Sequence, residues 1–173
     1  MGENHYGEIS IPKILIDEEI MAQITKDFCL NEIDVFLTSD VDSYESNGVI
    51  SYSDAMASGG CFDELESLLK QRRIPFDRYS SESYDYPPER VYFRPDREEG
   101  KEEICIPLDY DGETFIQVCY LQPLLTLSPL QMQVELQNLI NKHDPQVTPL
   151  AEYVMQNPSL MSNEQGDDQD GLY

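Results

Sequence analysis

The chain has 173 residues, 40% of them hydrophobic, and a formal net charge of −23. That length suits one domain with a substantial core, and the charge argues against a protein that binds nucleic acid or anionic membranes through lysine and arginine. Because the sequence shows no apolar run of transmembrane length and no secretory leader, we expect a cytoplasmic protein.

The first elements expected are a short strand and a helix. Residues 8–11 alternate polar and apolar and end at Pro12, which favours a strand at the edge or the end of a sheet. Asp17 is a suitable N-cap for a helix over about 17–29, because acidic residues follow in the first turn and an apolar stripe runs along the segment.

A hairpin with a long acidic loop is expected next. Residues 33–37 alternate like a strand, and a second strand resumes at 49–52. The polar segment between them predicts a solvated loop over 38–48 that carries Asp40, Asp42 and Glu45.

The clearest pattern in the sequence predicts a helix over 61–73. Its apolar residues recur at helical spacing, with acidic residues in the first turns and basic residues in the last, which complements the helix dipole. Gly59 and Gly60 supply a turn before the helix, and Pro75 ends it. An extended run over 74–79 follows, so we expect this helix to lie on a sheet.

Further strands are expected after the central helix. Residues 90–94 and 104–108 alternate apolar and polar side chains, and the pair Asp111-Gly112 favours a tight hairpin turn. Residues 114–121 then form the strongest β pattern of the chain, which predicts a strand after that turn.

Helices are expected near the C-terminus. Ser128 followed by proline is typical of a helix start, and the apolar stripe behind it continues to about His143. Thr148 and Pro149 repeat that signal ahead of a short second helix. Residues 161–173 are polar and acidic without an apolar period, and we expect a disordered acidic tail there.

Strands cluster in this order instead of alternating with helices, which predicts an α+β fold with a mostly antiparallel sheet and helices packed against it. We expect a single domain over 1–160, whose helical C-terminal part covers about 128–157. Six residues are predicted to lie in the core: Phe62, Leu65, Leu69, Phe93, Ile106 and Ile116.

The four cysteines indicate neither disulfides nor a metal site. Cys29, Cys61, Cys105 and Cys119 lie far apart in apolar surroundings and lack paired spacing, so we expect reduced core residues without metal or cofactor. The acidic segment 40–45 also lacks the glycine and glutamate positions of a calcium loop.

Charge is distributed unevenly along the chain. Eight of the eleven basic residues fall between Lys70 and Lys101, whereas residues 1–60 have a net charge of −10 and residues 114–173 one of −6. Solubility explains part of such an excess, but a carboxylate surface can also imitate nucleic-acid phosphates and occupy the basic groove of a DNA- or RNA-handling protein. Size and charge are then comparable to those of anti-restriction and anti-CRISPR DNA mimics.

Acidic residues in the expected loops and strand ends are the candidate contacts for such a basic partner. Interleaved tyrosines suit an interface, because tyrosine buries a large area and keeps a polar tip. Each tyrosine taken alone is also an ordinary strand residue. The candidate partner-binding residues are Asp40, Asp42, Glu45, Tyr84, Asp85, Tyr86, Glu98, Glu99, Glu102, Glu103, Asp109 and Asp111.

No catalytic motif accompanies this charge. The sequence has no nucleophile elbow, phosphate-binding loop or dinucleotide fingerprint, and its two histidines, His5 and His143, lie near the ends of expected elements. Carboxylate pairs are too common in this composition to indicate a hydrolase. We therefore expect a non-catalytic inhibitor of a basic protein. The alternatives are an immunity protein or antitoxin that neutralises a toxic enzyme, and a small enzyme or sensor domain.

Overall fold

The computed structural model describes residues 4–28, 41–82, 87–97, 100–109 and 111–161. These residues form a six-stranded antiparallel sheet in the order β2-β3-β1-β4-β5-β6, which confirms the expected α+β class. The strands are β1 (Asn4–Pro12), β2 (Val41–Ser46), β3 (Val49–Ser58), β4 (Phe76–Ser80), β5 (Glu89–Phe93) and β6 (Glu103–Pro107).

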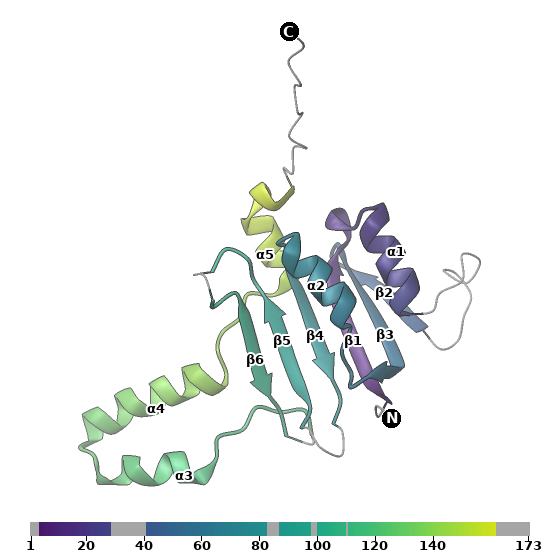
Figure 1. The fold of residues 1–173 in the computed structure, drawn as a ribbon. Coiled ribbons are helices and arrows are strands. Elements are labelled where there is room, and N and C mark those ends of the chain that lie inside the picture. The colour runs from purple at the N-terminus through teal and green to yellow at the C-terminus, as the bar shows by residue number, and fades with distance from the viewer. Residues whose placement is uncertain (1–3, 29–40, 83–86, 98–99, 110, 162–173) are drawn as a thin grey trace.

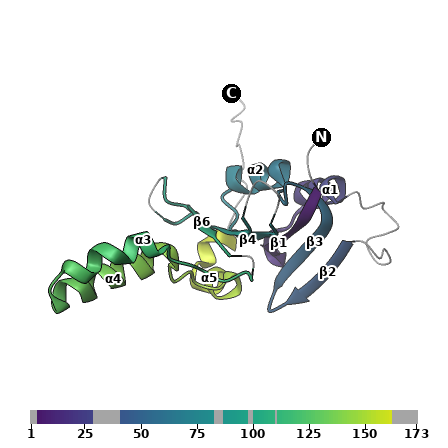
Figure 2. The same cartoon turned by 90° about the horizontal axis from the view of Figure 1, so that it is seen from below.

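Helices cover the two faces of the sheet unequally. Figures 1 and 2 show α1 and α2 on one face, α5 on the other, and α3 and α4 beyond the β6 edge. The α-helices are α1 (Glu18–Asp27), α2 (Asp63–Gln71), α3 (Val118–Leu121), α4 (Pro129–His143) and α5 (Leu150–Gln156). Short 3-10 helices are η1 (Lys13–Leu15), η3 (Gln122–Thr126) and η4 (Pro158–Met161).

The main core lies between the sheet and the helices α1 and α2. Ile20 and Ile24 of α1 and Leu65 and Leu69 of α2 are fully buried against it. The ring of Phe28 stacks on that of Phe62 with 4.7 Å between centroids. The apolar stripes seen in both helical segments therefore form one continuous core, as their spacing predicts.

Both helices begin and end close to the predicted positions. The side chain of Asp17 accepts a hydrogen bond of 3.0 Å from the Ile20 amide, so the expected N-cap of α1 is confirmed. Gly59 and Gly60 have φ of 62° and 68° before α2, the left-handed conformation that glycine adopts most readily. A Cβ on Gly60 would lie 2.6 Å from that of Ser80, so this turn also fits tightly against β4.

Five of the six predicted core residues are buried, and Ile116 is the exception. Phe62, Leu65, Leu69, Phe93 and Ile106 are each 7% exposed or less. Ile116 is half-buried, because the predicted strand over 114–121 does not form. After one bridge between Leu108 and Thr114, the segment leaves the sheet and enters α3. The segment does not continue pairing beyond this bridge, and β propensity without continued pairing decides little.

The hairpin prediction was wrong in the length of its loop, because a strand occupies most of the segment predicted as a loop over 38–48. Strand β2 covers 41–46 and joins β3 through a two-residue turn at Asn47 and Gly48, with φ of 52° and 77°. Both residues are left-handed there, as a tight hairpin turn requires, and Asn-Gly is the strongest short signal for such a turn. Asp42 and Glu45 therefore belong to a strand and not to a long acidic loop, while residues 33–37 and Asp40 lie outside the described residues.

Strand β1 occupies an interior position between β3 and β4, with Pro12 as its last residue. The expectation that Pro12 marks an edge or an end is thus met by the end of the strand. A proline there removes no ladder hydrogen bond from the middle of the strand.

The C-terminal helices follow the sequence signals. A reciprocal capping box between Ser128 and Gln131 starts α4, with Pro129 as its first residue. The second helix, α5, begins at Leu150 with Pro149 as its N-cap, one residue later than the sequence signal suggests. Of the segment expected to be a disordered tail, Met161 belongs to η4, and 162–173 lie outside the described residues.

Truncating the α2 core face tests this packing. Leu65→Ala or Leu69→Ala should lower the free energy of unfolding by about 2–5 kcal/mol, because each removes a fully buried side chain and leaves a cavity. Ser67→Ala, an exposed position on the same helix, should change it by less than about 0.5 kcal/mol. Urea unfolding measures both, and equal small effects for core and control variants would contradict the assigned helix face.

Candidate functional site

Half of the candidate partner-binding residues fall within the described part of the chain. Those that lie outside the described residues are Asp40, Tyr84, Asp85, Tyr86, Glu98 and Glu99. The structure therefore places Asp42, Glu45, Glu102, Glu103, Asp109 and Asp111.

The placed acidic candidates do not gather on one surface. Asp42 and Glu45 lie on β2, one outer strand of the sheet, whereas Glu103 opens β6, the outer strand at the opposite edge. Asp109 and Asp111 follow the other end of β6, in the turn that leads towards α3. The acidic residues predicted from the sequence to bind a partner thus form three separate acidic clusters.

Several of these carboxylates already have partners within the chain. Glu45 forms an ion pair with Lys13, with 2.7 Å between Oε2 and Nζ, and Glu103 forms one with Lys70. Asp109 accepts backbone hydrogen bonds from Asp111 and Glu113 at 3.0 and 2.9 Å, so it shapes its own turn. Among the placed candidates, Asp111 is the exposed carboxylate that this turn presents to solvent.

Internal ion pairs also join α1 to α2. The guanidinium of Arg72, near the end of α2, binds Asp17 and Glu19 at the start of α1. Lys26, near the end of α1, binds Glu64 at the start of α2. The two antiparallel helices therefore carry opposite charges where their ends meet, although exposed pairs of this kind each contribute about 1 kcal/mol or less.

Arg78 lies buried beneath α2, with 6% of its side chain exposed. Its Nε lies 3.0 Å from Glu66 of α2, one Nη lies 2.5 Å from Glu89 of β5, and the other donates to Ser80 at 3.0 Å. Glu66 also accepts a hydrogen bond from the Phe62 amide. Burial raises the pKa of Glu66 above its ordinary value, and the neighbouring Arg78 opposes that shift.

Arg94 plays the equivalent part on the opposite face, where its side chain is 3% exposed. It pairs with Asp77 at 2.7 Å and donates to the carbonyls of Phe76 and Thr148 at 3.1 and 3.0 Å. Its guanidinium lies 5.1 Å from the centre of the Tyr153 ring, a cation–π contact. Arg94 thereby attaches α5 and the segment before it to the sheet.

At least six of the eleven basic residues are therefore held by the chain's own carboxylates. Acidic residues outnumber basic ones 34 to 11, so most carboxylates cannot be neutralised within the chain. Which cations are buried could not be predicted from local sequence patterns, since it depends on strands and helices distant in sequence.

The described cysteines differ from the expected reduced core residues. Cys61 is partly exposed, and Cys105 and Cys119 are exposed free thiols; Cys29 lies outside the described residues. Although Cys105 is exposed as a residue, partial desolvation of its sulfur, together with the charges of Glu89 and Glu103, raises the pKa of this thiol to about 11. It stays protonated at neutral pH, which disfavours a thiolate nucleophile.

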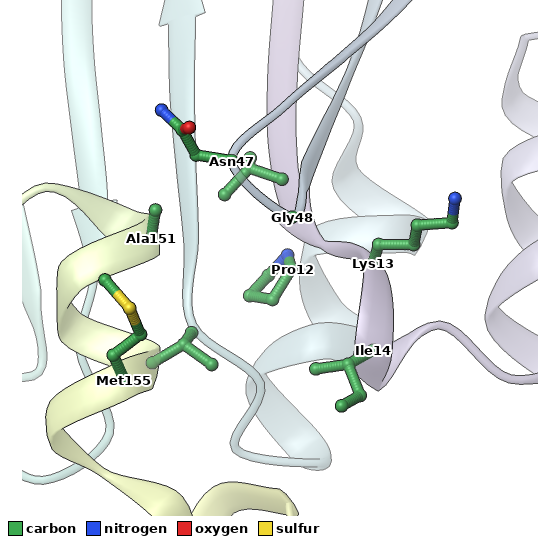
Figure 3. A pocket seen from close by; sticks show the side chains of 9 residues that line it. Pro12, Lys13, Ile14, Asn47, Gly48, Ala151 and Met155 are labelled. Carbon is green, nitrogen blue, oxygen red and sulfur yellow. The ribbon is translucent and has the colours of Figure 1, made fainter.

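An apolar pocket of about 560 Å³ lies where α5 approaches the end of β1 and the β2–β3 turn. Figure 3 shows Pro12 and the turn residues Asn47 and Gly48 facing Ala151 and Met155 of α5. Lys13 is the one charged residue in its lining, and its ammonium is engaged by Glu45. The volume suits a small ligand, but apart from the paired Lys13 this lining contains no acid–base or nucleophilic group.

The sequence interpretation missed a second kind of surface, on α3, η3 and α4. Large apolar side chains are exposed along this segment, with Leu125 76% and Leu130 74% exposed. A usable signal is present in the sequence, because residues 114–134 contain no charged side chain in a chain of net charge −23.

The chain was compared with protein families, curated proteins and solved structures. No family model, curated protein or solved structure matches the chain. Among the described residues, no helix is long and apolar enough to cross a membrane. The same part of the chain contains no group of three or more histidine, cysteine or acidic side chains arranged to hold a metal ion.

The buried Glu66 predicts a specific pH dependence of stability. Because its pKa is raised from 4.5 on folding, the unfolded chain releases this proton first as pH rises, and the folded state loses stability. The free energy of unfolding of the wild type, relative to Glu66→Gln, should therefore fall as pH increases from about 4.5 towards 7.

Urea unfolding at a series of pH values measures that difference. Glu152→Gln is the matched control, since Glu152 is exposed on α5, and its difference from the wild type should stay nearly constant. A relative stability that rises with pH would mean that Arg78 lowers the pKa of Glu66 on folding.

Proposed function

We propose that this protein is a non-catalytic acidic binding protein that occludes the nucleic-acid site of a basic, cytoplasmic partner, in the manner of DNA mimics directed against restriction or CRISPR systems. The observation that carries the proposal is the fate of its cations. At least six of eleven are held internally, so a partner meets mostly carboxylates. Long-range attraction to a basic groove follows from that imbalance.

Imitation of a phosphate backbone requires carboxylates from more than one element. Side chains on the same face of a strand are about 6.8 Å apart, whereas duplex DNA carries one charge per about 1.7 Å of its axis. The turn over 109–113 offers a denser arrangement, because Asp109, Asp111 and Glu113 alternate within five residues. Asp111 and Glu113 are exposed there.

Charge reversal tests which of the three acidic clusters contacts the partner. Three variants change one cluster each: Asp42 with Glu45, Glu102 with Glu103, and Asp111 with Glu113, all to lysine. Reversing the cluster that lies at the interface should weaken binding at least about tenfold. The same change should lower the free energy of unfolding by about 1 kcal/mol or less for each surface ion pair that is lost. Glu152→Lys, on the exposed side of α5, is the matched control and should bind nearly as the wild type does.

Affinity for the partner should also fall steeply with salt. Electrostatic association is screened over about 8–10 Å at physiological ionic strength, and most of the loss should appear in the association rate. Surface plasmon resonance at increasing salt measures both rates, using the partner captured by the immobilised protein from a lysate of the source cells. An affinity that is independent of salt would contradict an acidic interface.

Competition separates occlusion from the immunity-protein alternative. A DNA mimic must exclude nucleic acid from the captured partner, so added duplex DNA should displace the protein from it. An immunity protein can bind beside an active site and leave the substrate groove open. A partner that holds DNA and this protein together, with unchanged affinity for each, would rule out occlusion.

A further inference from the structure

The helical segment beyond the β6 edge has no core of its own. We call α3, η3 and α4 together the arm. None of these three elements contains a buried residue, although α4 alone is 15 residues long. Helices of that length are marginal in water unless an apolar face packs against something. The arm therefore lacks the packing that stabilises the rest of the helices.

Large apolar side chains of the arm are exposed to solvent. α3 and α4 are antiparallel, since Tyr120 of α3 lies 5.7 Å from His143 at the end of α4. Contacts between them leave the following side chains exposed: Val118, Tyr120, Leu125, Leu130, Val134, Leu136 and Ile140. Exposed apolar surface of this extent marks a binding site.

We propose that the arm binds the arm of a second copy of this chain and makes the protein a dimer. The absence of net charge on the arm favours a second arm as the partner that covers it. Residues 114–143 contain one acidic residue, Glu135, and one basic residue, Lys142, so the arm is neutral. A basic partner would favour carboxylates across its interface, whereas a second neutral arm matches this surface.

The position of the arm also permits two acidic molecules to meet. Both views show α3 and α4 extending beyond the β6 edge, away from α1, α2 and α5 (Figures 1 and 2). A 15-residue helix is about 22 Å long, more than twice the Debye length of about 8 Å at physiological salt. Arms can therefore pair while the two acidic sheets stay mostly screened from each other.

The exposed area is sufficient for a stable contact. At roughly 100 Å² apiece, about half the surface of a large side chain, the seven exposed residues offer about 700 Å² per copy. That is the share which one partner contributes to an interface of standard size. Two-fold pairing of identical surfaces is also the commonest form of soluble oligomer.

Sedimentation velocity of the full chain tests the dimer. Dilution from about 0.1 mM to about 0.1 μM should convert a dimer into a monomer at a measurable midpoint. The midpoint should shift to lower concentration as salt rises, since salt screens the repulsion between two copies of charge −23. This is opposite to the salt dependence of the acidic surface, so the two proposals fail independently.

Paired variants locate the contact. Leu130→Gln with Val134→Gln should weaken dimerisation at least about tenfold, and both positions keep good helix formers. Met155→Gln is the matched control, because Met155 is an exposed apolar residue on α5, outside the arm, and it should leave the midpoint unchanged. Urea unfolding of each variant verifies that the sheet remains folded.

Two outcomes would overturn the proposal. One is a wild-type protein that sediments as a monomer at about 0.1 mM in both low and high salt. The other is a dimer that Met155→Gln weakens and the arm variant does not, which would place the interface at the apolar pocket beside α5 instead.

Discussion

The arrangement of α2 on the sheet depends on the ion pairs of the buried Arg78 guanidinium. This guanidinium meets Glu66 of α2 and Glu89 of β5 from a position in the middle of β4, so one side chain connects three elements. Burying a charge is costly unless it is paired and hydrogen-bonded, and Arg78 satisfies that condition with two carboxylates and the Ser80 hydroxyl. Arg94 repeats the solution on the other face with Asp77 and backbone carbonyls. Together they fix α2 and α5 to opposite sides of the sheet, and neither cation is available to an outside partner.

Two surfaces with different physics result from this segregation of charge. The sheet with its covering helices presents carboxylates in excess, and binding of the proposed basic partner to this surface would weaken with salt. The arm is neutral and apolar, a surface whose binding rests on burial and persists in salt. A dimer held through its arms would carry two acidic surfaces at once, which raises the effective concentration of the second surface once the first is bound. Each surface is accounted for by its own residues, and neither proposal requires the other.

Local signals in the sequence were sufficient for α1, α2, α4 and α5 and insufficient for α3 and parts of the sheet. Asp17, the Ser128-Pro129 pair and the stripe through Leu65 and Leu69 predicted their elements well, because caps and periodicity are local properties. The hairpin register could have been read from Asn47-Gly48, whose turn requirement outweighs the weaker alternation at 33–37. The failure at 114–121 was different, since its residues favour a strand but form only one bridge, at Thr114, before the chain enters α3. Of the candidate site, net charge led only to a proposed class of partner, which stays a prediction. The separation of the acidic clusters depends on strand order, which local patterns do not contain.

Nitrogen-15 NMR of the arginine Nε–H groups tests most directly the central claim, that the guanidinium of Arg78 is buried in internal ion pairs. Arg78 and Arg90 lie in neighbouring strands, one buried and one exposed. Hydrogen exchange at neutral pH compares them without any partner. The account predicts a resolved Arg78 signal that exchanges far more slowly than that of Arg90, because its Nε–H is buried at 3.0 Å from Glu66, and Glu66→Gln should accelerate it. Exchange at Arg78 as fast as at Arg90 would show that its cation is open to solvent and to partners, and would contradict the account.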